Sequence, residues 1–302
     1  MTQAALILDH VSKSFGDLHA VCDLSAVIPA GSIYGLLGPN GAGKTTTLRM
    51  IMDILRPDSG RLEVLGRPTA AEVRGRIGYM PEERGLYRKM TVAGVLAYFA
   101  AVKGLDRSHA AAAADRWLHR VGLADRARQK VEELSRGLHQ KLQFAVTVVN
   151  QPELVILDEP FSGLDPVNLD LVKGIMLDMH HAGATIIFCT HVMHEAERLC
   201  DRLLLVSRGR AIVDSTLEDI RSRWPADTVT VELDGDAAFI SSLPMVTAVT
   251  PDGRRLDLAL RPGADPQQLL RALVDRTAVR SFQVKVPSLH EIFVRLVGDA
   301  DA

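Results

Sequence analysis

One short segment, from Gly38 to Thr46, constrains the fold of this chain more than any other. It reads Gly-Pro-Asn-Gly-Ala-Gly-Lys-Thr-Thr and matches the pattern GxxxxGK[ST]. Residues 31–38 form an apolar run of the kind that a buried strand has, and residues 45–55 place apolar side chains at helical spacing. A strand, a glycine-rich turn and a helix in this order wrap backbone N–H groups around a phosphate. The segment therefore predicts a domain that binds a nucleotide through its phosphates.

The residues of this loop have separate expected roles. The Lys44 ammonium is expected to bond the β- and γ-phosphates, and the Thr45 hydroxyl to ligate Mg²⁺. An ordinary glycine-rich turn is the alternative, and it is disfavoured because the motif positions and both flanking elements fit. The expected nucleotide-binding residues of the loop are Gly38, Pro39, Asn40, Gly41, Ala42, Gly43, Lys44, Thr45 and Thr46.

Composition excludes several classes of protein. The 35 Lys and Arg residues are balanced by 37 Asp and Glu, which argues against a general nucleic-acid binder and predicts no nucleic-acid partner. Three cysteines without CxxC spacing favour neither a disulfide framework nor a zinc site, and they fit a reducing cytosol. The first ten residues do not resemble a signal peptide, and the longest apolar run, 91–102, is shorter than the ~20 residues that span a bilayer.

Strand-like and helical runs alternate over most of the chain. The apolar runs 154–160 and 184–191 are typical of buried strands, with a helix through 169–182 between them. The stretch of about 88–150 is helical and suggests a helical subdomain. Alternation of this kind favours a mostly parallel sheet. The predicted fold class is α/β, with the mixed-sheet core of a P-loop NTPase and a helical subdomain, in a first domain covering residues 1–222.

A second domain is predicted from residue 223 to 302. The composition changes near Trp224 and Pro225, and the runs that follow are read as β, α, β, β, α, β. That order indicates a small α+β, ferredoxin-like domain. A final amphipathic helix is expected over residues 288–298.

Two carboxylates follow an apolar strand in the segment Leu154 to Glu159. Asp158 at the strand end is expected to hold Mg²⁺, directly or through water. Glu159 follows it and can polarise an attacking water. On its own, an Asp-Glu pair after a strand is more often a solvated strand end. A phosphate-binding loop on the same chain favours the functional interpretation.

Two further features can supply groups around a γ-phosphate. The segment 134–141 reads Leu-Ser-Arg-Gly-Leu-His-Gln-Lys and stands before a helix that Ser135 is expected to cap. His191 ends the apolar strand 184–191. Taken singly, each has an ordinary structural explanation, a helix cap and a strand end.

The joint order and spacing of these motifs resemble the ABC ATPases over residues of about 5–220. The motifs are the phosphate-binding loop, the Leu-Ser-Arg-Gly segment, Leu-Asp-Glu-Pro, Ser162-Gly-Leu-Asp165 and the strand-end His191. The resemblance implies a homodimer, arranged head to tail, with ATP between the loop of one subunit and the Ser135 segment of the other. It also implies that Ser135 and Gly137 contact the γ-phosphate in trans. By the same resemblance, Glu159 and His191 are the catalytic residues, Asp165 lies at the dimer seam and Phe15 stacks on adenine.

This chain departs from the family pattern at three places. Phe15 stands where a tyrosine is usual, and the exchange loses only a hydroxyl. The signature usually reads LSGGQ, and here Arg136 and Leu138 replace its third and fifth residues. The loop that usually carries a glutamine ligand for Mg²⁺ has Glu82 instead, which offers an oxygen ligand with a charge. Thr45, Asp158 and Glu82 are therefore the expected metal ligands. The basic stretch Arg84–Lys89 lies in the loop that in this family faces a permease.

These variants resemble one branch of the family, the ATPase subunits of sodium-efflux-like bacterial exporters, which carry an extra small C-terminal domain. The resemblance implies an ATP-binding and hydrolysing motor subunit that powers export through a separate transmembrane permease. It would lie in the cytoplasm, peripheral on the inner face of the membrane. A soluble ABC ATPase with a non-membrane partner, an importer ATPase and a P-loop kinase are the alternatives. The cargo, whether sodium, a drug, a peptide or a lipid, is not encoded in this subunit.

Overall fold

The computed structural model of the chain describes residues 3–83, 85–223, 228–235, 237–285 and 287–300. Arg84 and the predicted boundary residues Trp224 and Pro225 lie outside the described residues. The chain divides into two compact units, Met1–Leu217 and Glu218–Ala302, and each is described by itself. The predicted boundary after residue 222 falls within the second unit.

A six-stranded sheet forms the centre of the first unit. Its order is β5-β6-β7-β3-β8-β9, with the first five strands parallel and β9 antiparallel at the edge. Strands β3, β6 and β7 are buried along their whole length, because both faces of the sheet are covered. The strands are β3 (Ile33–Leu37), β5 (Ile77–Met80), β6 (Leu154–Asp158), β7 (Thr185–Thr190), β8 (Arg202–Ser207) and β9 (Arg210–Thr216).

A second, antiparallel sheet packs on this core. Its order is β2-β1-β4, with β1 at Ala4–Phe15, β2 at Leu18–Pro29 and β4 at Ser59–Val64. Alternate side chains of β2, at Leu24, Ala26 and Ile28, are buried in a cluster shared with the larger sheet. This period of two is what a half-buried strand requires.

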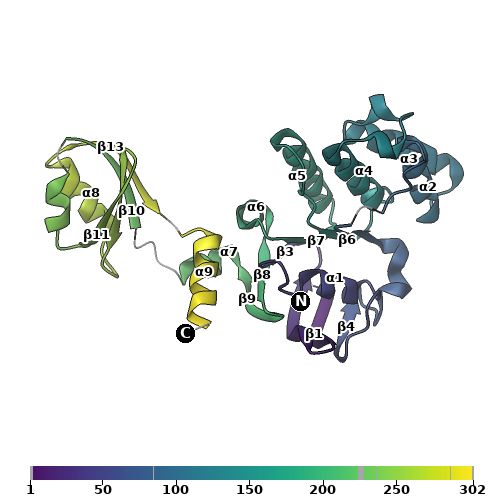
Figure 1. The fold of residues 1–302 in the computed structure, drawn as a ribbon, viewed down its shortest axis with the longest axis horizontal. Coiled ribbons are helices and arrows are strands. Elements are labelled where there is room, and N and C mark those ends of the chain that lie inside the picture. Colours follow the sequence, from purple (N-terminus) through teal and green to yellow (C-terminus); the bar gives the residue numbers. More distant parts are fainter. Residues whose placement is uncertain (1–2, 84, 224–227, 236, 286, 301–302) are drawn as a thin grey trace. The chain divides into compact units, whose positions relative to one another are not determined.

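Four helices of the first unit, α2 to α5, begin at a residue whose side chain caps them. Ser135 and Asp165 cap α4 and α5 through their side-chain oxygens. Figure 1 shows α2, α3 and α4 grouped together, apart from the three-stranded sheet. The helices are α1 (Lys44–Ile51), α2 (Val92–Val102), α3 (Arg107–Arg120), α4 (Arg136–Val148), α5 (Pro166–His181) and α6 (Met193–Leu199), with 3₁₀ segments at Ala70–Arg76, Ala124–Arg126 and Val131–Glu133.

One predicted helix is shorter than expected. The sequence predicted a helix over residues 45–55, but α1 ends at Ile51. Asp53 has a φ of 56°, in the left-handed region, and this conformation cannot continue a right-handed helix. The stop at Arg56-Pro57 was therefore the wrong signal, because the chain leaves the helix before it reaches the proline.

The second unit contains a four-stranded antiparallel sheet of order β11-β12-β10-β13. Its core is formed by Val229, Val231, Leu258, Leu269 and Leu273, all of which are fully buried. The first predicted helix is a 3₁₀ segment, Ala238–Ser242, and the element order otherwise follows the predicted ferredoxin-like pattern. The elements are α7 (Leu217–Ser222), β10 (Thr228–Asp234), β11 (Val246–Asp252), β12 (Arg255–Leu260), α8 (Pro266–Val274), β13 (Ala278–Lys285) and α9 (Leu289–Ala300).

Across the part of the chain that the structure describes, no helix combines the length and the apolarity that a bilayer crossing needs.

Candidate nucleotide-binding site

Three neighbouring parallel strands deliver the predicted site residues to one edge of the large sheet. Strand β3 leads into the glycine-rich loop, β6 ends at Asp158, and β7 ends just before His191. Because β6, β7 and β3 are adjacent and parallel, their carboxyl ends meet. This edge is where open α/β sheets bind ligands.

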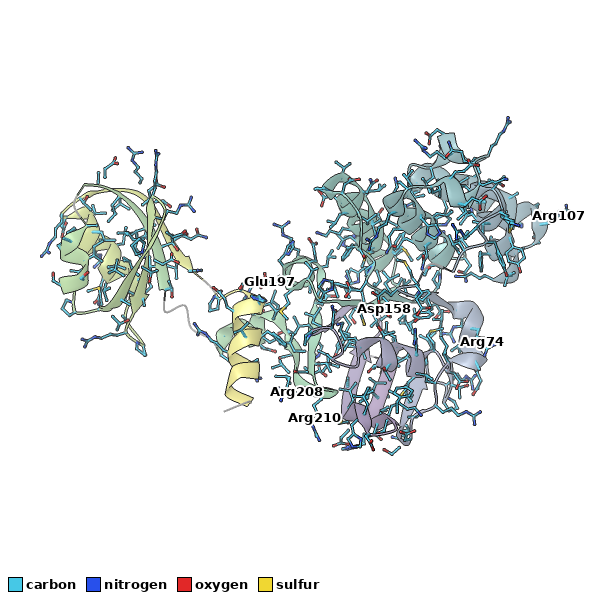
Figure 2. The ribbon with its side chains drawn as sticks, in the orientation of Figure 1. Arg74, Arg107, Asp158, Glu197, Arg208 and Arg210 are labelled. Atoms are coloured by element: carbon cyan, nitrogen blue, oxygen red, sulfur yellow. The ribbon has the colours of Figure 1, made fainter. Side chains whose placement is uncertain are left out.

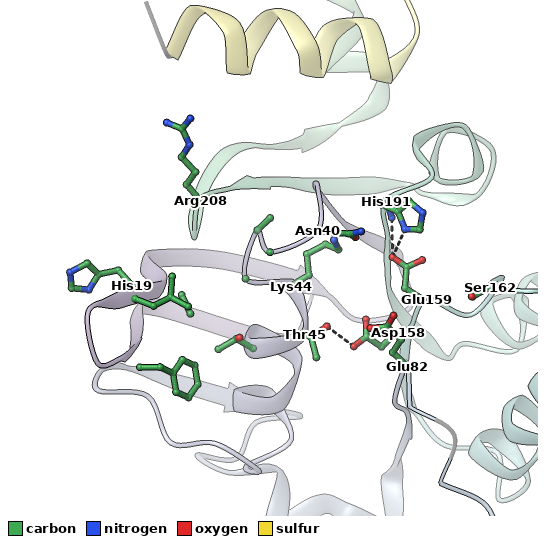
Figure 3. A pocket seen from close by; sticks show the side chains of 17 residues that line it. His19, Asn40, Lys44, Thr45, Glu82, Asp158, Glu159, Ser162, His191 and Arg208 are labelled. Atoms are coloured by element: carbon green, nitrogen blue, oxygen red, sulfur yellow. Dashed lines mark hydrogen bonds and ion pairs between the residues drawn. The ribbon is translucent and has the colours of Figure 1, made fainter.

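A pocket of about 630 Å³ opens at this edge (Figure 3). The side chains around it come from the loop before α1, from the ends of β6 and β7, and from the turns of two hairpins. They are Phe15, Leu18, His19, Ala20, Asn40, Gly41, Ala42, Gly43, Lys44, Thr45, Thr46, Glu82, Asp158, Glu159, Ser162, His191 and Arg208.

The glycine-rich loop is shaped by close backbone approaches. A Cβ added at Gly38 would lie 2.1 Å from the carbonyl oxygen of Val206, and one at Gly43 would lie 2.3 Å from that of Ala20. Only glycine fits either position. The Lys44 Nζ donates hydrogen bonds to the carbonyl oxygens of Gly38, at 2.8 Å, and Pro39, at 3.0 Å. The ammonium is thereby buried within the loop that is predicted to surround the phosphates.

Carboxylates line the opposite wall of the pocket. The Thr45 hydroxyl donates to an Asp158 carboxylate oxygen at 2.9 Å, and Glu82 lies beside this pair (Figure 3). Burial raises the pKa of Asp158, and the negative charges of Glu82 and Glu159 raise it further, against the Thr45 hydrogen bond. Figure 2 shows Asp158 in the interior of the first unit, with Arg74 and Arg107 at its periphery. A cation at this place would relieve the crowding of negative charge.

These oxygen atoms fit a partial coordination shell for Mg²⁺. Within the described ranges, no group of three or more His, Cys, Asp or Glu side chains is arranged to hold a metal ion. Two carboxylates and one hydroxyl, from Glu82, Asp158 and Thr45, leave coordination positions for phosphate oxygens and water. Mg²⁺ in phosphate-transfer sites is bound in this way, by a few protein oxygens together with the substrate.

Glu159 and His191 form a pair at the mouth of the pocket. The His191 Nδ1 lies 2.8 Å from a Glu159 carboxylate oxygen, and the His191 backbone N–H donates to the same oxygen at 3.1 Å. Glu159 has a φ of 49°, which is uncommon for a residue with a side chain, and its backbone N–H donates to the carbonyl of Cys189. The backbone strain thus coincides with the predicted catalytic carboxylate.

Helix α4 holds both loops that carry the acidic residues. The buried Gln140 amide donates to the carbonyls of Glu159 and Pro160, each at 3.1 Å. One turn further on, the buried Gln143 amide donates to the carbonyls of Pro81, at 2.7 Å, and Glu83, at 3.1 Å. The two glutamines therefore fix the backbone on either side of Glu82 and at Glu159.

Five predicted nucleotide-binding residues do not line this pocket. Two of them, Gly38 and Pro39, belong to the glycine-rich loop and accept the Lys44 hydrogen bonds through their carbonyls. The other three are Ser135, Gly137 and Asp165. Ser135 caps α4 through a hydrogen bond from the Leu138 N–H, and Asp165 caps α5 through one from the Asn168 N–H. The latter bond and the Asn168 side chain hold the pKa of Asp165 below its usual range. Gly137 packs against the carbonyl of Gly163, which lies 3.1 Å from where a Cβ would stand. All three residues lie at the starts of α4 and α5, outside the pocket.

The structure also adds residues that sequence reasoning missed. His19 lines the pocket from the start of β2 and Arg208 from the β8–β9 turn, and no motif marks either of them. Ser162 lies in a motif that the sequence identified, although it was given no role. Gln140 and Gln143 act through hydrogen bonds between elements that are distant in the sequence, so spacing alone could not reveal them.

Comparison with protein families gives two matches. Residues 21–162 match the family described as ABC transporter. Residues 216–297 match the family described as ATP-binding protein DrrA1-3-like, C-terminal domain. The two matches cover the glycine-rich loop through Ser162 and nearly all of the second unit.

Individual relatives match along nearly the whole chain. The uncharacterized ABC transporter ATP-binding protein YhaQ of Bacillus subtilis is 41% identical over 97% of this chain and 98% of its own length. The Nod factor export ATP-binding protein I of Sinorhizobium fredii is 35% identical, over 98% of this chain and 87% of its own length. A solved structure described as the ATP binding subunit of an ABC transporter superposes with a TM-score of 0.68 at 29% identity, covering 73% of this chain and 93% of that one.

Proposed function

The chain belongs to the ABC transporter ATP-binding proteins, and from this premise we propose that it is the motor subunit of an exporter, in which Mg²⁺-dependent ATP hydrolysis drives a separate permease. The observation that carries the proposal is the single pocket that unites Lys44, Asp158 and Glu159. The positive charge of Lys44 suits the phosphates, the negative charge of Asp158 suits Mg²⁺, and the Glu159 carboxylate suits the attacking water. The export direction rests on the similarity to a Nod factor export protein.

The phosphates bind first through the loop before α1. Lys44 exchanges its bonds to the Gly38 and Pro39 carbonyls for bonds to the β- and γ-phosphates, while the first N–H groups of α1 face the phosphate charge. Phe15, 46% exposed at the other end of the pocket, provides an aromatic face for adenine.

The acidic wall prepares the hydrolytic step. Thr45, Asp158 and Glu82 would hold Mg²⁺, which supplies charge neutralisation of the phosphate oxygens when it is bound. The Glu159 carboxylate orients and polarises the attacking water, and His191 holds that carboxylate in place while its exposed ring faces the γ-phosphate. The strained Glu159 backbone restricts the carboxylate to this position.

A complete site requires a second copy of the chain. Ser135, Gly137 and Asp165 lie outside the pocket of their own chain, although the family resemblance assigns them to ATP. In a head-to-tail dimer, the Ser135 hydroxyl and the N-terminus of α4 would face the γ-phosphate held by the partner. The positive end of that helix suits an anion.

An exposed aromatic cluster supports the permease partner. Tyr87 is 52% exposed and Tyr98 43% exposed, and their ring centroids lie 5.4 Å apart. Phe99 stacks against Tyr87 at 6.0 Å. Exposed clusters of this kind mark protein interaction sites. Tyr87 also lies within the stretch Arg84–Lys89 that the sequence predicted as the permease contact. We infer that the chain is bound there at the inner face of the membrane.

Two assays test this function. The purified chain should release phosphate from ATP with Mg²⁺ and stop when the metal is chelated. Asp158→Asn should lose this activity, whereas Glu153→Gln, which removes a charge that pairs with Arg76 outside the pocket, should keep it. Turnover that is indifferent to chelation would overturn the Mg²⁺ role.

The partner is tested by finding out whether a gene beside this one encodes a multi-span protein and, where it does, by coexpression with that protein. The chain should move to the membrane fraction with that protein, and inverted vesicles should accumulate cargo with ATP. A Tyr87→Asp variant should keep basal ATPase activity and lose membrane recruitment. Recruitment that is unaffected would contradict the proposed contact.

A further inference from the structure

Arg136 makes a contact that the family signature, with its glycine, cannot make. The Arg136 Nη2 donates a hydrogen bond to the Ser162 hydroxyl at 3.1 Å. The stem of the arginine lies over Gly163, so that a Cβ there would stand 2.7 Å from the Arg136 Nε. Gly163 has a φ of 76° and leaves the space that the side chain occupies. The arginine that departs from the signature thus has a hydrogen-bond acceptor in Ser162 and space for its side chain at Gly163.

The segment from Glu159 to Gly163 carries the catalytic carboxylate at one end and Ser162 near the other. Both Glu159 and Ser162 line the ATP pocket. Helix α4 holds the segment at each end. The Gln140 amide donates hydrogen bonds to the Glu159 and Pro160 carbonyls, and Arg136 donates one to the Ser162 hydroxyl. A strained residue such as Glu159 keeps its conformation only when its surroundings fix it.

We propose that Arg136 is a positioning residue for Glu159, acting through Ser162 within its own chain. The idea rests on the proposed ATPase function. It adds a link between two ATP sites, because Arg136 adjoins Ser135, which in the head-to-tail dimer meets the ATP of the partner. Through the contact between Arg136 and Ser162, the binding of the partner's ATP at Ser135 is linked to the position of the Glu159 carboxylate in the chain's own ATP site.

The contact is well suited to a test because it contributes little to stability. Arg136 is exposed, and exposed polar contacts contribute only a small part of the free energy of unfolding. Arg136 is also the first residue of α4, where alanine is well tolerated. Arg136→Ala and Ser162→Ala should therefore fold like the wild type.

The first experiment is a double-mutant cycle on ATP turnover. Arg136→Ala and Ser162→Ala should each lower kcat about threefold to tenfold, which corresponds to the free energy of one ordinary hydrogen bond. The KM for ATP should not change, because the glycine-rich loop is untouched. The double variant should be no slower than the slower single variant. Arg136→Gln, which can still donate to Ser162, should recover most of the rate.

Arg120→Ala is the matched control, since Arg120 forms an ion pair with Asp178 outside the ATP pocket. It should leave kcat unchanged. An unchanged kcat in Arg136→Ala, a rise in KM alone, or effects of Arg136 and Ser162 that simply add would overturn the positioning role. This cycle decides that role even if the chain does not form the proposed dimer.

The second experiment distinguishes action within the chain from action on the partner. Two heterodimers carry the same two substitutions, Arg136→Ala and Glu159→Gln. In the first heterodimer each chain carries one substitution. In the second, one chain carries both substitutions and the other chain is wild type. Glu159→Gln leaves one working site in each. The rate should fall only when the two substitutions are on different chains, because the working Glu159 then lacks its own Arg136. A fall only in the other arrangement would overturn the proposal in favour of a contact in trans.

Discussion

Lys44, Asp158 and Glu159 lie together in one pocket, whereas Ser135 and Asp165 stand outside it at the starts of two helices. Both groups come from the same chain and from the same set of motifs. The first group is assembled by the parallel sheet, whose strand ends meet at one edge. The second is held at helix caps that do not line that pocket. The difference supports our proposal that one chain binds ATP and a second chain encloses it.

The largest expected effect comes from the pocket's carboxylate. Glu159→Gln should reduce kcat roughly hundredfold to ten-thousandfold, because an amide cannot polarise the attacking water as a carboxylate does. ATP binding should persist, and the ATP-bound dimer should accumulate because hydrolysis no longer separates it. Size-exclusion chromatography with ATP–Mg²⁺ measures the dimer. A variant that turns over at the wild-type rate, or stays monomeric at high concentration, would contradict the mechanism.

The next effect concerns binding alone. Lys44→Ala removes the one ammonium of the loop and should weaken ATP binding by about 1.5–3 kcal/mol, roughly tenfold to a hundredfold in Kd. Calorimetry measures the affinity, and thermal unfolding of the free variant checks that the loop still folds. Undiminished ATP binding would contradict the assignment of the phosphates to this pocket, and the contrast between the pocket residues and the helix-cap residues would then fail.

A smaller effect is expected at the adenine end. Phe15→Ala should weaken ATP binding by about 1 kcal/mol, roughly fivefold, since stacking on a base contributes in this range. Phe15→Tyr keeps the ring and should bind like the wild type. The same calorimetric titration with triphosphate alone should not distinguish the variants; a difference there would place Phe15 at the phosphates instead.

A conservative exchange is expected to be tolerated at Glu82, where this chain departs from its family. Glu82→Gln keeps an oxygen ligand and should hold ATPase activity within about tenfold, or 1.4 kcal/mol of barrier. Glu82→Ala should impair permease-stimulated hydrolysis more than basal hydrolysis, because the same loop leads to the predicted permease contact. Both rates are measured side by side. An alanine variant that remains fully stimulated would leave Glu82 without a coupling role.

The sequence motifs predicted the residues that line the site better than the residues that hold them in position. The family, the α/β fold class and the ATP-binding function that they indicated are confirmed by the comparisons. Each of those motifs is a short segment at a strand end or a helix start, so its local structure follows from adjacent residues. Gln140, Gln143 and the Arg136–Ser162 contact join elements that are distant in the sequence, and no local pattern encodes such pairs. The early end of α1 at Ile51 likewise depends on the backbone of Asp53, which periodicity does not reveal.

The central claim is that one ATP site is built from two chains, and complementation between inactive variants tests it most directly. Ser135→Arg blocks the segment at α4, and Lys44→Ala disables the glycine-rich loop, so each homodimer should be inactive. Mixing the two chains creates heterodimers in which one site carries both defects and the other carries neither. We predict that the mixture regains ATPase activity that neither variant has alone. Heterodimers that form and bind ATP at the intact site, yet hydrolyse none, would contradict the composite site.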